Sequence, residues 1–175
     1  MRKRAGYGPC VLPAKATDIV SFMAVSMQRD DALAHDVHEL VNVHLDFARS
    51  ETPLCHAFAL SAEALVTDDI ELCSCRDNGE LLAIGALRDL GDDHFEIKSM
   101  HTKESARGRG IGRLMLSHLI AVARRRGATR VSLETGTSSG FAPARSLYEK
   151  LGFTLCEPFG DYSPSPDNIC MTILL

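Results

Sequence analysis

The stretch Arg107-Gly108-Arg109-Gly110-Ile111-Gly112-Arg113 places three glycines and three arginines within seven residues. The residues before it, 95–102, have the composition of a strand, and those after it, 111–126, repeat apolar residues at helical spacing. The first backbone N–H groups of a helix lack intrahelical acceptors, and the helix dipole adds partial positive charge there. Glycines let a phosphate approach this backbone, and arginines add charge and bidentate donors. The sequence therefore predicts an anion site at the start of this helix.

The spacing of the glycines excludes two common phosphate-binding motifs. A P-loop requires G-x-x-x-x-G-K-[ST], and the chain contains no Gly-Lys-Ser or Gly-Lys-Thr sequence. A dinucleotide-binding G-x-G-x-x-G motif that begins at Gly108 would need a glycine at the position of Arg113. What the stretch does contain is the pattern R-x-x-G-x-G, from Arg107 to Gly112.

This pattern resembles the acetyl-CoA pyrophosphate loop of the GNAT superfamily of N-acetyltransferases. Residues 144–153, ARSLYEKLGF, resemble the A-x-x-L-Y-x-x-x-G-F helix of the same family, and residues 95–102 resemble its fourth strand. The segments 96–100, 133–136 and 141–145 are more narrowly similar to the YsnE-like branch of the family.

The resemblance implies the GNAT fold, an α/β (α+β) architecture. Its mixed, mostly antiparallel sheet has six or seven strands, with helices on both faces. Two parallel strands, here residues 95–102 and 130–134, are expected to splay apart and bind CoA between them. We expect a single N-acetyltransferase domain over residues 17–175, preceded by a loose N-terminal tail over residues 1–16.

The remaining elements are predicted from composition and periodicity. The Asn78-Gly79 pair is typical of a tight hairpin turn, because both residues tolerate positive φ. We predict a strand over 19–26, a helix from Asp30 or Asp31 to about Arg49, a short helix over 61–66, a hairpin of strands 70–76 and 81–90, a helix that begins near Pro143 and ends at Gly152, and strands over 153–157 and 169–175.

Composition is that of an ordinary globular protein. The chain has 175 residues, of which 45% are hydrophobic and 24% charged, and its net charge of −4 disfavours a nucleic-acid binder that would use the arginines of residues 107–113. No apolar run reaches the ~18 residues that a membrane span needs, so we expect no membrane partner. The cysteines include no C-x-x-C pair, and Cys73 and Cys75 should point to one face of a strand. We expect reduced thiols, no metal site and a cytoplasmic location.

The resemblance implies an acetyl-CoA-dependent N-acetyltransferase without a metal. The acetyl group would pass, by direct attack in a ternary complex, to an amine of a small molecule or a protein. A homodimer is an expectation from the family. The alternative is a regulatory module that senses acetyl-CoA and catalyses nothing.

The expected cofactor site combines the glycine-rich loop with the edge of the preceding strand. The pantetheine arm carries amides, so it can pair with an open strand edge as a further strand would. The acetyl carbonyl would end near Ser99 or Met100, where a backbone N–H could stabilise the oxyanion. The expected cofactor-binding residues are Met100, His101, Thr102, Arg107, Gly108, Arg109, Gly110, Ile111, Gly112 and Arg113.

Tyr148 matches the position of the tyrosine acid of the family, and the resemblance implies that it protonates the departing thiolate. The alternative is a core tyrosine that packs beneath its helix. The chain departs from the family at Phe141, where an asparagine that contacts the pantetheine or the sheet is common. One expected contact to the pantetheine arm is therefore absent.

Glu96 is the first candidate for the base that deprotonates the amine. It lies eleven residues before Arg107, the offset of the catalytic glutamate in the histone-acetyltransferase branch. Strand alternation places it on one face with Lys98, Met100 and Thr102. Since Lys98 would lower the pKa of the carboxyl, a structural ion pair is the alternative. Glu134 is the second candidate, as the base or as a group that holds a cationic acceptor.

Overall fold

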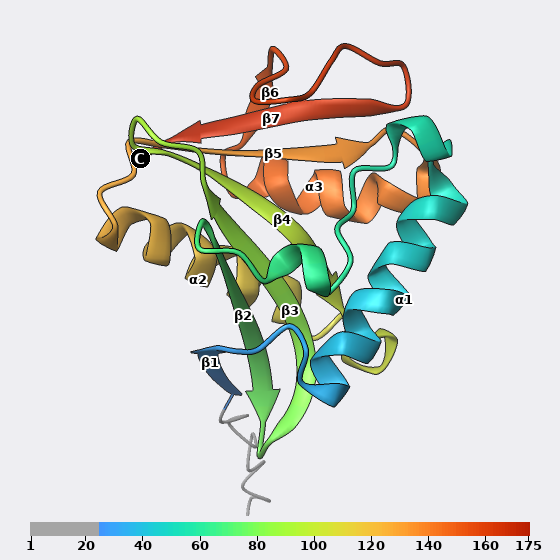
Figure 1. Ribbon diagram of the computed structural model, residues 1–175, viewed down its shortest axis with the longest axis vertical. Coiled ribbons are helices and arrows are strands. Elements are labelled where there is room, and N and C mark those ends of the chain that lie inside the picture. The colour runs from blue at the N-terminus through green and yellow to red at the C-terminus, as the bar shows by residue number, and fades with distance from the viewer. Residues whose placement is uncertain (1–24) are drawn as a thin grey trace, which may run out of the picture.

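The computed structural model describes residues 25–175, which form one mixed sheet with helices around it (Figure 1). The seven strands are β1 Val25–Arg29, β2 Ile70–Asp77, β3 Glu80–Asp89, β4 His94–Thr102, β5 Arg130–Gly136, β6 Thr154–Cys156 and β7 Asn168–Leu174. The helices are α1 His35–Glu51, α2 Ile111–Arg125 and α3 Ala142–Lys150, and the short 3-10 turns are η1 Leu54–His56, η2 Glu63–Leu65, η3 Glu104–Ala106 and η4 Ser139–Phe141.

The strands follow the order β1-β2-β3-β4-β5-β7-β6. Only the central neighbours β4 and β5 run parallel, and the other neighbouring pairs are antiparallel. The chain crosses from β4 to β5 through α2, as a parallel pair requires. The predicted fold class, a mixed and mostly antiparallel sheet with one parallel pair, is confirmed.

Helices cover both faces of the sheet, and each face has its own apolar core (Figure 1). The core under α1, which we call the α1 face, includes Val37, Val41, Leu72, Ile84 and Ala86. The core under α2 and α3, which we call the α2 face, includes Cys73, Ala83, Met115, Leu119 and Tyr148. Neighbouring residues of β2 and β3 thus serve opposite cores, as the period of two in a strand requires.

The first helix begins later than predicted. Neither Asp30 nor Asp31 caps it, because α1 starts at His35 without a side-chain cap. Asp31 instead accepts the backbone N–H two residues further along, at 2.9 Å, and closes a turn. Asp30 accepts a hydrogen bond from Arg76 at 2.8 Å. Both carboxylates therefore accept hydrogen bonds from other groups and do not cap the helix.

Other predicted elements are shorter or lie outside the described residues. The helix expected over 61–66 is the 3-10 turn η2. The strand expected over 19–26 lies mainly outside the described residues. Its last two positions are the first two residues of β1. The expected tail, residues 1–16, lies outside the described residues entirely. The hairpin, α2, α3 and the last two strands lie within a few residues of their predicted bounds.

The cysteines of residues 25–175 are free, and Cys73 and Cys75 both point into the core of the α2 face, as alternation predicted. Burial raises the pKa of the Cys73 thiol to about 12, so this thiol stays protonated. Cys55, in contrast, is exposed. Within the same residues no three His, Cys, Asp or Glu side chains converge as metal ligands would. None of the helices described is both long enough and apolar enough to span a bilayer.

Candidate active site

The parallel strands β4 and β5 separate halfway along their length. Their pairing runs from His94 opposite Arg130 to Ile97 opposite Leu133 and stops there. Beyond this point β4 remains paired with β3, and β5 remains paired with β7 as far as Gly136. A cavity of about 460 Å³ reaches into the resulting fork. The splay that the resemblance implied is therefore present.

Side chains from two helices hold the far arm of the fork in place. Arg145 of α3 donates to the carbonyl oxygens of Gly136 at 2.7 Å and Ser138 at 2.9 Å. The Ser138 hydroxyl donates to Glu51 at the end of α1, at 2.6 Å. A Cβ at Gly136 would collide with the ring of Phe141, so only glycine fits this close approach. The segment after β5 is thus fastened to both α1 and α3.

A β-bulge interrupts β4 at the fork. Ala86 of β3 pairs with Lys98, whereas Ile84 pairs with His101, so two residues of β4 stand opposite one residue of β3. Ser99, the first residue of the bulge, has φ of +50°, which is uncommon for a residue other than glycine. The bulge turns the side chain of His101 toward α1.

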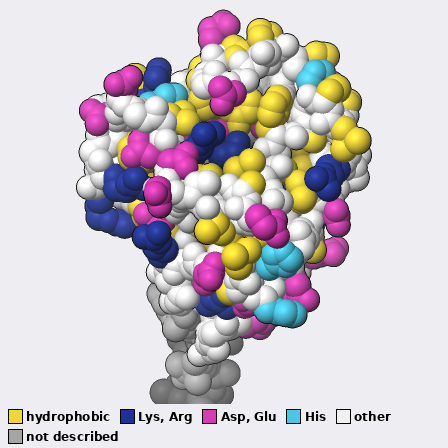
Figure 2. All heavy atoms as spheres, viewed as in Figure 1, with side chains coloured by type: hydrophobic (Ala, Val, Ile, Leu, Met, Phe, Trp, Pro, Cys, Tyr) yellow, Lys and Arg dark blue, Asp and Glu magenta, His cyan; other side chains and the backbone are white. Residues whose placement is uncertain are grey.

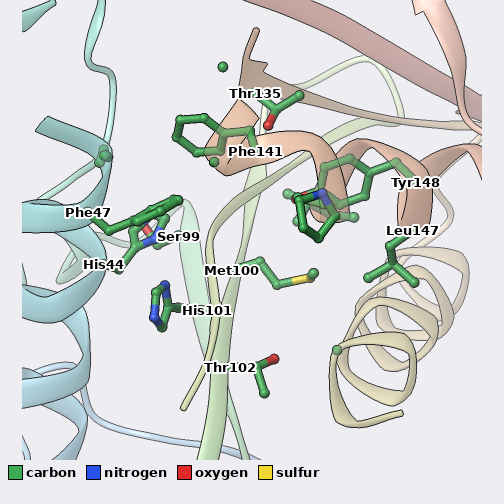
Figure 3. A pocket seen from close by; sticks show the side chains of 18 of the residues that line it. His44, Phe47, Ser99, Met100, His101, Thr102, Thr135, Phe141, Leu147 and Tyr148 are labelled. Atoms are coloured by element: carbon green, nitrogen blue, oxygen red, sulfur yellow. The ribbon is translucent and has the colours of Figure 1, made fainter. Parts of the chain in front are cut away.

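Because of the bulge, the side chains of β4 do not alternate between the two faces as predicted. Glu96 and Lys98 lie on the α1 face, because Ile97 between them belongs to the core of the α2 face. Met100 packs on the α2 face, and Thr102 lies beside α2. Figure 3 shows Met100 and Thr102 pointing away from α1 while His101 points toward it. The expectation that Glu96, Lys98, Met100 and Thr102 share one face is therefore wrong beyond Lys98.

The glycine-rich loop lies at the α2-face end of the cavity. Gly108 and Gly110 have φ of +74° and +80°, and a Cβ on either would meet no atom within 4 Å. Gly110 is the N-cap of α2 and no side chain caps the helix, so no cap side chain occupies the N–H groups of its first turn. Arg107 donates to the carbonyl oxygen of Thr102 at 3.3 Å. Open space above uncapped donors, beside arginines, suits an anion.

The structure brings most of the expected cofactor-binding residues to this cavity. Those that line it are Met100, His101, Thr102, Arg107, Gly108, Gly110, Ile111, Gly112 and Arg113. Arg109 is outside the lining, and its guanidinium lies 3.9 Å from the carboxylate of Asp77. Burial, followed by the charge of Arg107, lowers the pKa of His101 to about 4, so its ring is neutral near pH 7.

Tyr148 of α3 belongs both to the core and to the cavity wall. Its side chain is 7% exposed, and its ring packs against Phe153 with 6.1 Å between ring centroids. The same residue lines the cavity, and Figure 3 shows it on the α3 side of the fork. Burial, with a smaller contribution from the negative charge of Glu134, raises the pKa of Tyr148. Its hydroxyl therefore keeps its proton at neutral pH.

Glu96 lies behind the cavity wall and does not line it. The residue is 2% exposed, and its carboxylate accepts hydrogen bonds from Lys98 at 3.2 Å and from the hydroxyl of Tyr162. Lys98 also donates to the Tyr162 hydroxyl at 2.6 Å. The ion pair considered from the sequence is present, but as part of a three-residue network.

Tyr162 is a site residue that the sequence did not reveal. It lies in the proline-rich connection between β6 and β7 and lines the cavity on the α1 face. Burial first, and then the adjacent Glu96, raise the pKa of Tyr162, so it is a hydrogen-bond donor at neutral pH. Its partners lie 64 and 66 residues earlier in the chain, so no local pattern marks it.

Glu134 lines the cavity directly and is the first residue of β5 beyond its pairing with β4. It follows Leu133, the last residue of β5 that pairs with β4. Burial raises the pKa of Glu134 to about 7, although the positive charge of Lys98 acts in the opposite direction. The carboxyl group is therefore about half ionised at neutral pH, which is unusual for a glutamate.

Aromatic side chains form much of the cavity wall on the α1 face. Phe47 of α1 and Phe141 of η4 meet edge to face with 5.0 Å between centroids. Phe141, at which the resemblance implied a departure from the usual asparagine, thus contributes an aromatic ring to the wall. Burial, followed by the charges of His101 and Lys98, lowers the pKa of His44 to about 4. Figure 2 shows hydrophobic side chains over the region between α1 and the strands β5 and β7, with a few basic side chains among them.

Comparison with known proteins places this site in a family. The sequence model of the acetyltransferase (GNAT) family matches residues 18–153. The chain is 42% identical over 143 residues to YsnE, an uncharacterized N-acetyltransferase of Bacillus subtilis (strain 168), covering 82% of this chain and 95% of YsnE. It is 36% identical over 150 residues to YedL, an uncharacterized N-acetyltransferase of Escherichia coli (strain K12), covering 86% of this chain and 94% of YedL.

A solved structure shares the fold. The PaiA N-acetyltransferase of Thermoplasma acidophilum, solved in complex with coenzyme A, superimposes with a TM-score of 0.62 at 15% identity. The match covers 87% of this chain and 100% of that protein. Together, the family match, the relatives and the splayed fork show that the chain belongs to the acetyltransferase (GNAT) family and is an N-acetyltransferase.

Proposed function

We propose that this enzyme transfers the acetyl group of acetyl-CoA to an amine by direct attack within a ternary complex. The observation that carries the proposal is the continuity of the cavity, which joins the glycine-rich loop on the α2 face to Glu134 and Tyr162 on the α1 face. Each substrate can approach from its own face and meet the other at the bulge of β4. Such an arrangement needs no acetylated enzyme.

The α2 face fits the cofactor. The uncapped N–H groups at the start of α2, with Arg107 and Arg113, would bind the diphosphate. The edge of β4 from Met100 to Thr102, which β5 leaves unpaired, would receive the amides of the pantetheine arm. Acetyl-CoA supplies the activated acetyl group when it is bound there.

Two groups of the chain would assist the departure of the thiolate. A backbone N–H of the bulge at Ser99 and Met100 would stabilise negative charge on the carbonyl oxygen. The hydroxyl of Tyr148 would donate its proton to the sulfur. Its raised pKa keeps the hydroxyl protonated before the reaction, so the donor is present in every enzyme molecule.

Glu134 is the group in best position to take the proton of the amine. It lines the cavity, and a pKa of about 7 is close to the optimum for a general base at neutral pH. Glu96 does not line the cavity, so we assign it a positioning role through Lys98 and Tyr162.

The test is a set of initial rates with acetyl-CoA and an amine both varied. Release of the free thiol should give intersecting reciprocal plots, and intact-mass analysis with acetyl-CoA alone should show no acetylated enzyme. Parallel plots with an acetyl-enzyme mass would contradict direct attack. Thermal stabilisation by acetyl-CoA, without thiol release across a broad amine panel, would favour the alternative of a non-catalytic acetyl-CoA sensor.

A further inference from the structure

The acceptor side of the cavity is walled by two aromatic pairs. Phe47 and Phe141 form one edge-to-face pair, with centroids 5.0 Å apart. Phe58 and Tyr162 form the other, with centroids 4.9 Å apart and an interplanar angle of 87°. All four side chains line the cavity. They come from α1, η4, the segment after η1 and the connection before β7, so the fold gathers them from four separate segments.

The charges on this face favour a cation over an anion. Among the described residues, the lysine and arginine side chains that line the cavity are Lys98, Arg107 and Arg113, and the two arginines belong to the cofactor loop. Lys98 is 9% exposed as a side chain and is already bonded to Glu96 and Tyr162. Lys98 is therefore occupied within the protein and is a poor anchor for a carboxylate of the ligand.

His56, which also lines the cavity, is already paired with a carboxylate. Nδ1 of His56 lies 2.7 Å from the carboxylate of Asp167. The positive charge that acts on Glu134 is that of Lys98, which is ion-paired with Glu96. Among the described residues, Glu134 is thus the carboxyl group of the cavity lining that an incoming ammonium can satisfy, and the four aromatic side chains line the same cavity.

We propose that the acceptor is an arylalkylamine: a compact primary amine with a flat aromatic body and no carboxylate of its own. Its ammonium group is bound by Glu134, and its ring lies between the Phe47–Phe141 and Phe58–Tyr162 pairs. The aromatic faces favour both the ring and the cation next to it. An amino acid would bring a carboxylate toward Glu96 and Glu134, and among residues 25–175 the cation that lines this side of the cavity, Lys98, is already ion-paired. This inference rests on the proposed function.

The transfer is balanced without a further reactant. Glu134 takes one proton from the ammonium, and the nitrogen lone pair then forms the C–N bond as the C–S bond breaks. Tyr148 gives its proton to the departing thiolate, and the nitrogen returns a proton to the Tyr148 phenolate. The products are the N-acetylated amine and coenzyme A, and Glu134 releases its proton to solvent.

The experiment compares amines that differ by one feature, with thiol release measured for the full-length enzyme. Phenethylamine and phenylalanine differ by the carboxylate, and phenethylamine and n-butylamine differ by the ring. We expect kcat/KM for phenethylamine to exceed that for phenylalanine by about 100-fold and that for n-butylamine by about tenfold. Equal or better turnover of phenylalanine or n-butylamine would overturn the proposal.

Two pairs of variants test the residues named. Phe58→Leu should bring phenethylamine and n-butylamine to similar kcat/KM. Phe159→Leu is the matched control, because Phe159 also contacts Tyr162, at 5.2 Å between centroids, but does not line the cavity. Glu134→Gln should reduce the preference for phenethylamine over phenylalanine, whereas Glu149→Gln, an exposed carboxylate on α3, should not. Retention of both preferences in Phe58→Leu and Glu134→Gln would contradict the assignment.

The outcome also separates this inference from the function on which it rests. Efficient acetylation of an amino acid, a polyamine or a peptide would overturn the arylalkylamine acceptor and leave amine acetylation standing. Acetyl-CoA binding without turnover of any amine would overturn both. The wild-type panel decides the matter even if a variant fails to fold.

Discussion

The two sides of the β4–β5 fork are built in different ways. On the α2 face, the candidate cofactor site consists mainly of backbone: a strand edge without a partner and the first N–H groups of a helix, within the contiguous residues 100–113. On the α1 face, the candidate acceptor site consists of side chains from α1, β4, β5 and the connection before β7. A backbone site needs glycines at fixed spacing, whereas a side-chain site needs only that distant segments pack together.

The two sides also differ in charge, and each side carries the charge opposite to that of its proposed ligand. Arg107 and Arg113 line the α2-face end, where a diphosphate would bind. Glu134 lines the α1-face end, with Glu96 buried behind it. The acetyl group would cross between these ends. Since each ligand would contact its own end, substitutions on one side should affect the binding of one ligand and spare that of the other. The predictions below test this separation.

The largest effect is expected at the junction of the two sides, for Tyr148→Phe. We expect kcat to fall by about 1,000-fold, since general acid catalysis typically contributes 10²–10⁴-fold. The Kd for acetyl-CoA should change little, because the ring remains packed against Phe153. Stopped-flow thiol release and calorimetric titration measure the two quantities. A kcat within about threefold of wild type would mean that Tyr148 serves packing alone.

Glu134→Gln should stabilise the enzyme without ligands at alkaline pH. Burial raises the pKa of Glu134 from its ordinary 4.5 to about 7, so the folded protein holds a proton that the unfolded chain has released in this interval. The group contributes its full stability below pH 4.5, and that contribution is lost as the pH rises through 7. The variant should gain up to about 3 kcal/mol over wild type at pH 8, relative to the difference at pH 4.5.

Urea unfolding at both pH values measures this gain. Glu149→Gln, at an exposed position, is the control and should show no pH-dependent difference. A gain of the same size at both pH values would show that Glu134 ionises normally.

Gly110→Val should affect the α2-face side alone. Valine is strained at φ of +80°, and its side chain would enter the space where the diphosphate is proposed to bind. We expect the Kd for acetyl-CoA to rise about 100-fold, which corresponds to about 2.7 kcal/mol. Gly91→Val is the matched control, because Gly91 has the same φ of +80° and equally open surroundings in a turn away from the cavity. Similar losses in both variants would attribute the effect to strain.

The smallest effect is expected for Glu96→Gln, which should lower kcat about tenfold by loosening Lys98 and Tyr162. The acidic limb of the pH profile of kcat/KM distinguishes positioning from general base catalysis. We expect this limb, near pH 7 in the wild type, to persist in Glu96→Gln and to disappear in Glu134→Gln. The reverse result would make Glu96 the base.

The contrast between the two sides explains how much the sequence could predict. The glycines with positive φ, the helix α2 and the strand before it all lie within one contiguous stretch, so this strand, loop and helix could be predicted from local spacing. The fork itself followed from the resemblance and not from composition.

The sequence predictions that were wrong or missing also have physical causes. The bulge in β4 centres on Ser99, a residue that gives no sign of its φ of +50°, so alternation was carried too far along the strand. Asp30 and Asp31 are good helix caps in isolation, but Asp30 is taken by Arg76 from another strand. Tyr162 could be identified as a site residue only from the fold, which places its hydroxyl against Glu96 and Lys98. Each depends on a contact between residues distant in the sequence or on a backbone shift.

A crystal structure with bound coenzyme A tests the central claim most directly. We predict that its diphosphate accepts hydrogen bonds from the N–H groups of residues 108–113. Its pantetheine amides should pair with β4 between Met100 and Thr102, and its thiol should lie in the fork beside Tyr148. Coenzyme A bound elsewhere, or β5 paired with β4 beyond Leu133 in the complex, would contradict the account.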